Sequence, residues 1–203
     1  MILCYDQTIL FYKAVTIIKA QSHYALGRYL SKKYLQNIPE KYIRAFLLGC
    51  IEPDKNPTTY LKGSIRSHFL RGHNWESSQR YMQRIAKRLE RRKKFRLTDY
   101  YTLGKLVHYT ADAFTYAHNS TFSDGLPAHR QYETNLQQYF LAYLPQAMPH
   151  TPGIRSGIMD AIRRYHREYS SHCANIQRDS KYCIAATSMV MNTLLSKAPL
   201  PAL

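Results

Sequence analysis

Apolar residues recur at helical spacing along nearly the whole chain, and this periodicity constrains the fold more than any other feature. Tyr42, Ile43, Phe46 and Leu47, for example, would form one apolar stripe on a helix. The alternation of apolar and polar residues that marks a half-buried strand does not compete with this pattern. The sequence therefore predicts an all-α fold. A chain of 203 residues is long enough to bury a core in one compact multi-helix domain, 1–203.

Glycines, prolines and capping residues divide the chain into helices. We expect a helix or helix pair over about 7–34, and a second helix that starts near Pro39 and ends at Gly49 and Pro53. Composition predicts loops at 52–64 and 119–127. Further helices are expected from Asn74 or Ser77 to about Lys94, from a cap at Thr98, and over about 128–146, 153–173 and 180–196. Residues 1–20 are expected to form an N-terminal extension and 197–203 a flexible tail.

The chain is strongly basic, with a formal net charge of +16. Eight of its Lys and Arg residues lie between Arg84 and Arg96. Such a charge favours polyanionic partners, whether anionic lipid head groups, nucleic acid or a phosphorylated substrate. The basic stretch fits either the solvated end of a helix or an anion-binding surface, and the sequence does not distinguish them.

The N-terminal segment argues against a secretory signal and against a membrane-spanning helix. It lacks a basic leading region, and Asp6, Lys13 and Lys19 interrupt its apolar run. The four cysteines form no C-x-x-C pair, so buried thiols in a reducing compartment are expected. We therefore expect a cytoplasmic protein that can contact a membrane peripherally.

Residues 103–136 carry a pattern of potential metal ligands. His108 and Asp112 are four residues apart, so both project from one face of a helix, and His118 follows. His129 and Glu133 are again four apart, at the start of the next helix. A single histidine is more often a packed residue than a ligand. Two imidazole–carboxylate pairs on successive helices, however, favour a site for zinc or a similar divalent metal.

The order of these residues resembles the bacterial zinc-dependent phospholipase C family. The family pattern is an early His, an Asp and a His fourteen residues apart, H-x3-D-x5-H, and then H-x3-E. In this chain the pattern is filled by His23, Asp54, His68, His108, Asp112, His118, His129 and Glu133. The resemblance implies a compact all-α domain with a cluster of zinc ions, in the fold that the family shares with single-strand nucleases.

The resemblance also implies which residues share an ion. Asp54, His68, His108 and Asp112 would hold one zinc ion, with His68 preferred over His73 on spacing. His118, His129 and Glu133 would hold a second ion, and His23 would share a third with Asp112 as the bridge. In secreted family members an N-terminal Trp completes the third site. Here about twenty residues precede His23 and the only Trp is Trp75, so two ions are better supported than three.

The function implied by the resemblance is hydrolysis of a phospholipid to diacylglycerol and a phosphorylated head group by a zinc-activated water. Asp54 or Glu133 would accept the proton from that water. The partner would be a phospholipid or an anionic membrane surface. Two alternatives stay open. One is a zinc-dependent nuclease specific for single strands, with nucleic acid as the substrate. The other is a non-catalytic helical domain that metals stabilise and that binds a membrane or a partner.

Overall fold

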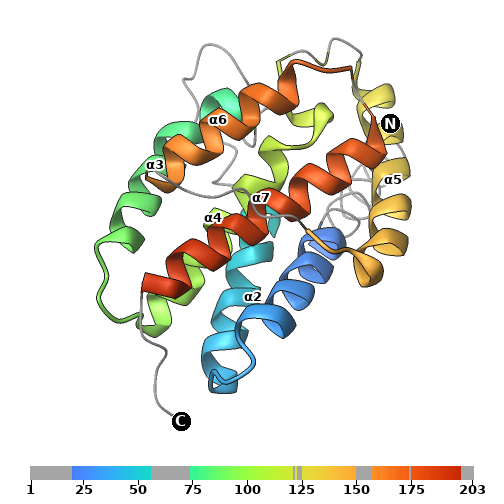
Figure 1. Ribbon diagram of the computed structural model, residues 1–203. Coiled ribbons are helices and arrows are strands. Elements are labelled where there is room, and N and C mark those ends of the chain that lie inside the picture. The colour runs from blue at the N-terminus through green and yellow to red at the C-terminus, as the bar shows by residue number, and fades with distance from the viewer. Residues whose placement is uncertain are drawn as a thin grey trace, which may run out of the picture.

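The computed structural model describes residues 20–55, 74–120, 122, 125–149, 157–173 and 175–197. All regular elements among them are helical, which confirms the predicted all-α fold. Residues 20–34 form the first described helix. The elements that follow, shown in Figure 1, are α2 (Glu40–Lys55), α3 (Trp75–Glu90), α4 (Leu97–Ala113), the 3-10 turn η2 (Tyr116–His118), α5 (Leu126–Tyr143), the 3-10 turn η3 (Leu144–Gln146), α6 (Ile158–Ser170) and α7 (Ile176–Lys197).

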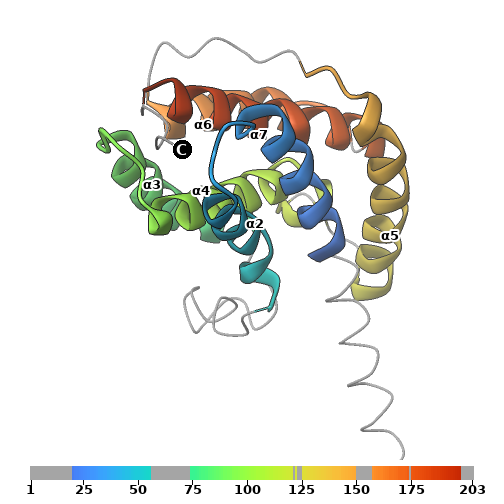
Figure 2. The same ribbon diagram turned by 90° about the horizontal axis from the view of Figure 1, so that it is seen from below.

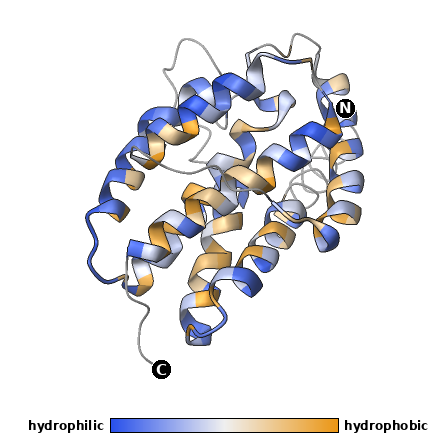
Figure 3. Cartoon of the chain, viewed as in Figure 1, coloured by the Kyte–Doolittle hydropathy of each residue, from blue (hydrophilic) through white to orange (hydrophobic). Residues whose placement is uncertain are grey.

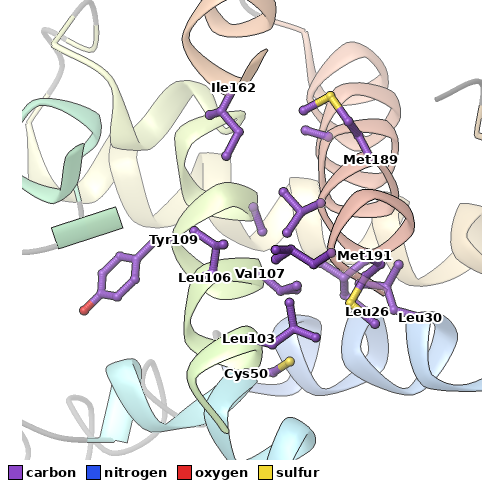
Figure 4. Packing of buried hydrophobic residues seen from close by; sticks show 14 of the residues in the cluster. Leu26, Leu30, Cys50, Leu103, Leu106, Val107, Tyr109, Ile162, Met189 and Met191 are labelled. Carbon is purple, nitrogen blue, oxygen red and sulfur yellow. The ribbon is translucent and has the colours of Figure 1, made fainter. Parts of the chain in front are cut away.

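Helix α4 lies at the centre of the molecule. From Asp99 to Ala113 every residue except Tyr101 is buried, and α4 packs against α2, α3 and α7. Figure 4 shows Leu103 and Val107 of α4 close to Met191 of α7 and to the first described helix. A helix enclosed on several sides is apolar around most of its circumference. Between Thr102 and Ala113, the polar side chains that α4 carries are therefore held inside the protein.

The helices α2 and α4 cross where two glycines meet. A Cβ atom on Gly104 would lie 2.8 Å from the backbone nitrogen of Cys50 and would collide with the carbonyl oxygen of Phe46. The prediction that Gly49 and Pro53 end the second helix is wrong, because α2 continues to Lys55. Gly49 serves the crossing, because its missing side chain allows the close approach of α4, and Pro53 lies inside α2. The extra turn carries Asp54 alongside α4.

The basic stretch is partly structural. The carboxylate of Asp99 is fully buried and accepts hydrogen bonds from Arg88 and Arg92, each at 3.3 Å. Its second oxygen accepts from the backbone N–H of Arg96 at 3.0 Å. Helix α4 therefore begins at Leu97 with Arg96 at the N-cap position predicted for Thr98, and Asp99 satisfies the backbone N–H of Arg96.

Helix α3 ends earlier than predicted, at Glu90. The Glu90 side chain accepts a hydrogen bond from the backbone N–H of Ile158 at 2.7 Å, so it caps the start of α6. Helices α3 and α6 contact each other, and Figure 3 shows that both are predominantly hydrophilic on the side in view. The two helices thus form one outer layer of the fold, with their apolar faces turned inward.

Helix α5 lies on the opposite side of the molecule from α3, as Figure 2 shows. It packs against α7 and η2, while the Tyr29 hydroxyl of the first described helix donates to the Ala147 carbonyl beyond its end at 2.8 Å. The first described helix, α4 and α5 are thereby held around a common space. None of the described helices is long and apolar enough to cross a membrane.

Candidate metal centre

His108 projects from the middle of α4 and is fully buried. Its Nδ1 lies 2.8 Å from the carbonyl oxygen of Cys50 in α2, so Nδ1–H donates to that carbonyl. This hydrogen bond directs Nε2 toward two carboxylates, with Asp112 Oδ2 at 3.2 Å and Asp54 Oδ1 at 3.8 Å. A ring whose far nitrogen is hydrogen-bonded to a backbone carbonyl has the orientation and tautomer of a metal ligand.

Asp112 is the junction of the cluster. Its Oδ1 lies 3.1 Å from Nε2 of His23 and 3.9 Å from Nε2 of His118, while Oδ2 faces His108. These three imidazoles come from the first described helix, from α4 and from η2. The i,i+4 spacing of His108 and Asp112 on a buried helix accounts for one contact, and helix packing accounts for the other two.

The first group of candidate ligands is His23, Asp54 and His108. Nε2 of His23 lies 3.9 Å from Asp54 Oδ2, and the rings of His23 and His108 stack with centroids 3.9 Å apart. The resemblance assigns His23 to a third ion. In the structure, its Nε2 lies with the residues expected around the first ion.

The second group is His118, His129 and Glu133. Glu133 Oε1 lies 3.2 Å from Nε2 of His118 and 3.0 Å from Nε2 of His129. Helix α5 supplies His129 and Glu133 one turn apart, and the short turn η2 supplies His118. The structure thus brings together seven of the eight predicted residues. His68, together with its rival His73, lies outside the described residues.

The donor set fits zinc. Atoms that share one ion at bond lengths of about 2.0–2.2 Å lie roughly 3–4 Å apart, and the nitrogen–oxygen separations here are 3.0 to 3.9 Å. Imidazole and carboxylate are ligands of zinc and of similar divalent metals. Each of the two groups can hold one ion, and Asp112 lies between them.

The electrostatics of the cluster favour a cation. Burial alone would lower the pKa of His108, but Asp112 and Asp54 outweigh it and raise that pKa to about 9. Burial likewise acts to raise the pKa of Asp112, but His118, His108 and His23 outweigh it and lower that pKa well below its ordinary value. Asp112 therefore keeps its negative charge inside the protein, where either a proton on a neighbouring imidazole or a metal ion can balance it.

A cavity of about 100 Å³ opens beside the cluster. Its lining includes five cluster residues, His23, Asp54, Asp112, His118 and Glu133, and also Leu26 and Phe140. Arg130 and Asp179 line the same cavity, and reasoning from the sequence did not identify them. Arg130 directly follows the candidate ligand His129, so its position in the sequence could have indicated that it lies near the site. Asp179 lies on α7, far along the chain from the candidate ligands, and nothing in its neighbouring sequence indicates that it lines the cavity.

His166, which is outside the ligand pattern, has a structural role. Its ring stacks on Trp75 with centroids 4.1 Å apart, and Nε2–H donates to the side-chain oxygen of Asn119 at 2.7 Å. Burial lowers its pKa to about 4, against smaller opposite effects of Glu76 and the Ala113 carbonyl. His166 is therefore neutral near pH 7 and packs as part of the core.

A helical fold whose central helix carries buried histidine and aspartate, with two ion-sized groups of donors, defines a candidate metalloprotein. The family model for zinc dependent phospholipase C matches residues 20–182, and the chain belongs to that family. The seven clustered residues all lie within the matched region. No curated protein and no solved structure matches the chain.

Proposed function

We propose that the protein is a zinc-dependent phosphodiester hydrolase of phospholipase C type, which cleaves a phospholipid to diacylglycerol and a phosphorylated head group. The observation that carries the proposal is the convergence of seven imidazole and carboxylate side chains, in two groups joined by Asp112, beside a cavity. Membership of the zinc dependent phospholipase C family supports it.

We propose that the described residues bind two zinc ions. His23, Asp54 and His108 would hold one ion and His118, His129 and Glu133 the other, with Asp112 shared. Zinc in such a site supplies positive charge to the phosphate oxygens and lowers the pKa of a bound water. The protein side chains would fix the ions, exclude bulk solvent and accept the proton.

We assign the proton acceptor to Asp54, in addition to its place in the first group, and a ligand role alone to Glu133. Glu133 Oε1 lies within 3.2 Å of two imidazole nitrogens, so this oxygen is placed to share their ion. The Asp54 oxygens lie farther from their imidazoles, at 3.8 and 3.9 Å. In the reaction, water oxygen would bond to phosphorus, the bond to the glycerol oxygen would break, and the water proton would pass to Asp54. The glycerol oxygen would take this proton from Asp54, which gives diacylglycerol and regenerates the carboxylate.

The test is metal analysis combined with three substrates. The zinc-loaded protein would be assayed on phospholipid vesicles, on single-stranded DNA and on a small model phosphodiester. Release of diacylglycerol with zinc bound supports the proposal. Cleavage of DNA but not of lipid would show the nuclease alternative. Bound zinc without turnover of any substrate would contradict both enzyme functions and favour a metal-stabilised binding domain.

A matched pair of variants shows whether the activity belongs to this cluster. Asp112→Ala removes the shared carboxylate, and we expect loss of zinc and of activity. Asp160→Ala removes an exposed carboxylate on α6 that pairs with Arg163, three residues along the same helix, at 3.1 Å, and it serves as the control. Full activity in Asp112→Ala would exclude the cluster as the site.

A further inference from the structure

Asp179 is a buried carboxylate outside the two groups of candidate ligands. It lies in the first turn of α7, is 1% exposed, and lines the cavity beside the cluster. Its oxygens accept three hydrogen bonds. Tyr116 N–H and the Tyr132 hydroxyl donate to Oδ2 at 2.8 and 2.7 Å, and the Tyr169 hydroxyl donates to Oδ1 at 2.7 Å.

These three donors come from three different elements. Tyr116 is the first residue of η2, which ends at His118. Tyr132 lies in α5 beside Glu133 and three residues after His129. Two of the three hydrogen bonds therefore attach Asp179 to the two elements that carry the whole second group. The third attaches it to α6, which carries none of the candidate ligands.

The arrangement matters because η2 is short. A single 3-10 turn is not held by an extended ladder of backbone hydrogen bonds, so its direction depends on side-chain contacts. Asn119 fixes the far end, where its amide donates to the carbonyls of Thr115 and Ala113 at 2.8 and 3.2 Å. Asp179 fixes the near end through Tyr116. His118 lies between these two anchors.

We propose that Asp179 is the positioning residue of the second metal site, holding η2 and α5 in the register that brings His118, His129 and Glu133 to one ion. The proposal rests on the proposed zinc site. It gives Asp179 no contact with the ion, because its oxygens already accept three hydrogen bonds from Tyr116, Tyr132 and Tyr169. Partners that orient ligands typically change metal affinity by about 10- to 100-fold when they are lost.

The experiment is a zinc titration of the metal-free protein that resolves two classes of site, followed by calorimetry and by competition with a chromophoric chelator. In Asp179→Asn we expect zinc affinity at the second site to fall by about 10-fold or more. The first site, built from His23, Asp54 and His108, is the internal control and should keep its affinity. Equal weakening of both sites, or no change in either, would overturn the proposal.

A second pair of variants keeps the test decisive if Asp179→Asn does not fold. Tyr132→Phe and Tyr169→Phe each remove one hydroxyl from the same carboxylate. Only Tyr132 lies on an element that carries ligands. We expect Tyr132→Phe to weaken the second zinc more than Tyr169→Phe does, at comparable losses of thermal stability. An equal change of zinc affinity in the two variants would show that these hydrogen bonds only stabilise the fold, and it would contradict the positioning role.

These readouts are independent of catalysis. If the protein binds two zinc ions and hydrolyses no phosphodiester, the proposed function fails while the role of Asp179 is still measured by the two affinities. If the protein hydrolyses phospholipid and Asp179→Asn retains both affinities, the function stands and the positioning role fails.

Discussion

At the scale of single residues, the cluster is built from carboxylates that each contact more than one imidazole. Asp112 contacts three imidazoles, and each of these contacts comes from a different element. Asp54 and Glu133 contact two imidazoles each but at different distances. Asp54 lies farther from its imidazoles than Glu133 does from its own, so we expect substitutions of the two residues to have different effects.

Asp54→Asn is expected to lower kcat by roughly 10²- to 10⁴-fold, because an amide accepts no proton. The zinc content should stay near that of the unaltered protein, because the amide oxygen can still bind the ion. Glu133→Gln is expected to lower zinc affinity first, and activity as a consequence. Zinc analysis and turnover on a model phosphodiester, measured on the same preparations, check both. Loss of zinc in Asp54→Asn with zinc retained in Glu133→Gln would reverse the assignment.

His166 predicts a pH dependence of stability that is separate from the cluster. Its pKa is about 4 in the folded protein and near 6.5 in an unfolded chain. As the pH falls the unfolded chain binds the proton first. The contribution of His166 to stability is therefore complete above about pH 6.5 and is lost as the pH falls through about 4. The loss is about 3 kcal/mol.

Urea unfolding at pH 7.5 and at pH 4.5 measures this effect. In His166→Gln, which retains a donor toward Asn119, the difference in unfolding free energy between the two pH values should shrink. An identical difference in the variant and the unaltered protein would show that His166 does not carry the effect.

At the scale of elements, the crossing of α2 and α4 sets the distance between the first candidate ligands. His108 lies one turn beyond Gly104 on α4, and Asp54 lies in the last turn of α2. The bond from His108 to the Cys50 carbonyl spans the same crossing. The close contact at Gly104 therefore positions the first group as well as packing the core.

Gly104→Ala is expected to destabilise the fold by about 1–3 kcal/mol, because the new methyl group meets the backbone of α2. It should also weaken zinc binding at the first group by moving His108 away from Asp54. Chemical unfolding and zinc titration measure the two effects. Gly125→Ala is the control, since a Cβ there would come no closer than 3.7 Å, at Pro127, to the side chains that the structure describes. Equal stability in the two variants would contradict the tight crossing.

At the scale of the whole molecule, the cluster connects the first described helix, α2, α4, η2 and α5. Metal binding should therefore stabilise the fold as a whole. We expect a chelator to lower Tm and zinc to restore it. At a free zinc concentration about 1,000 times Kd, the gain is about 4 kcal/mol per site. The response should be reduced in Asp112→Ala. A Tm that does not change with chelator would contradict a resident metal.

The sequence predicts those parts of the site that depend on local geometry. The pairs His108–Asp112 and His129–Glu133 follow from the pitch of a helix, which the spacing alone defines. The approach of Asp54 to His108 depends on the crossing of α2 and α4. Gly49, which permits that crossing, is interpreted from the sequence as the end of a helix. Asp179 reaches the site only through the packing of α7. Contacts of this kind need the tertiary arrangement and carry no signal in local spacing.

The central claim is that two groups of side chains, joined by Asp112, each bind one zinc ion. A crystal structure of the zinc-loaded protein, with anomalous scattering recorded on both sides of the zinc absorption edge, tests it most directly. We predict one anomalous peak among His23, Asp54 and His108 and another among His118, His129 and Glu133, about 3.5–4 Å apart. Zinc peaks elsewhere on the protein, with both groups empty, would contradict the claim.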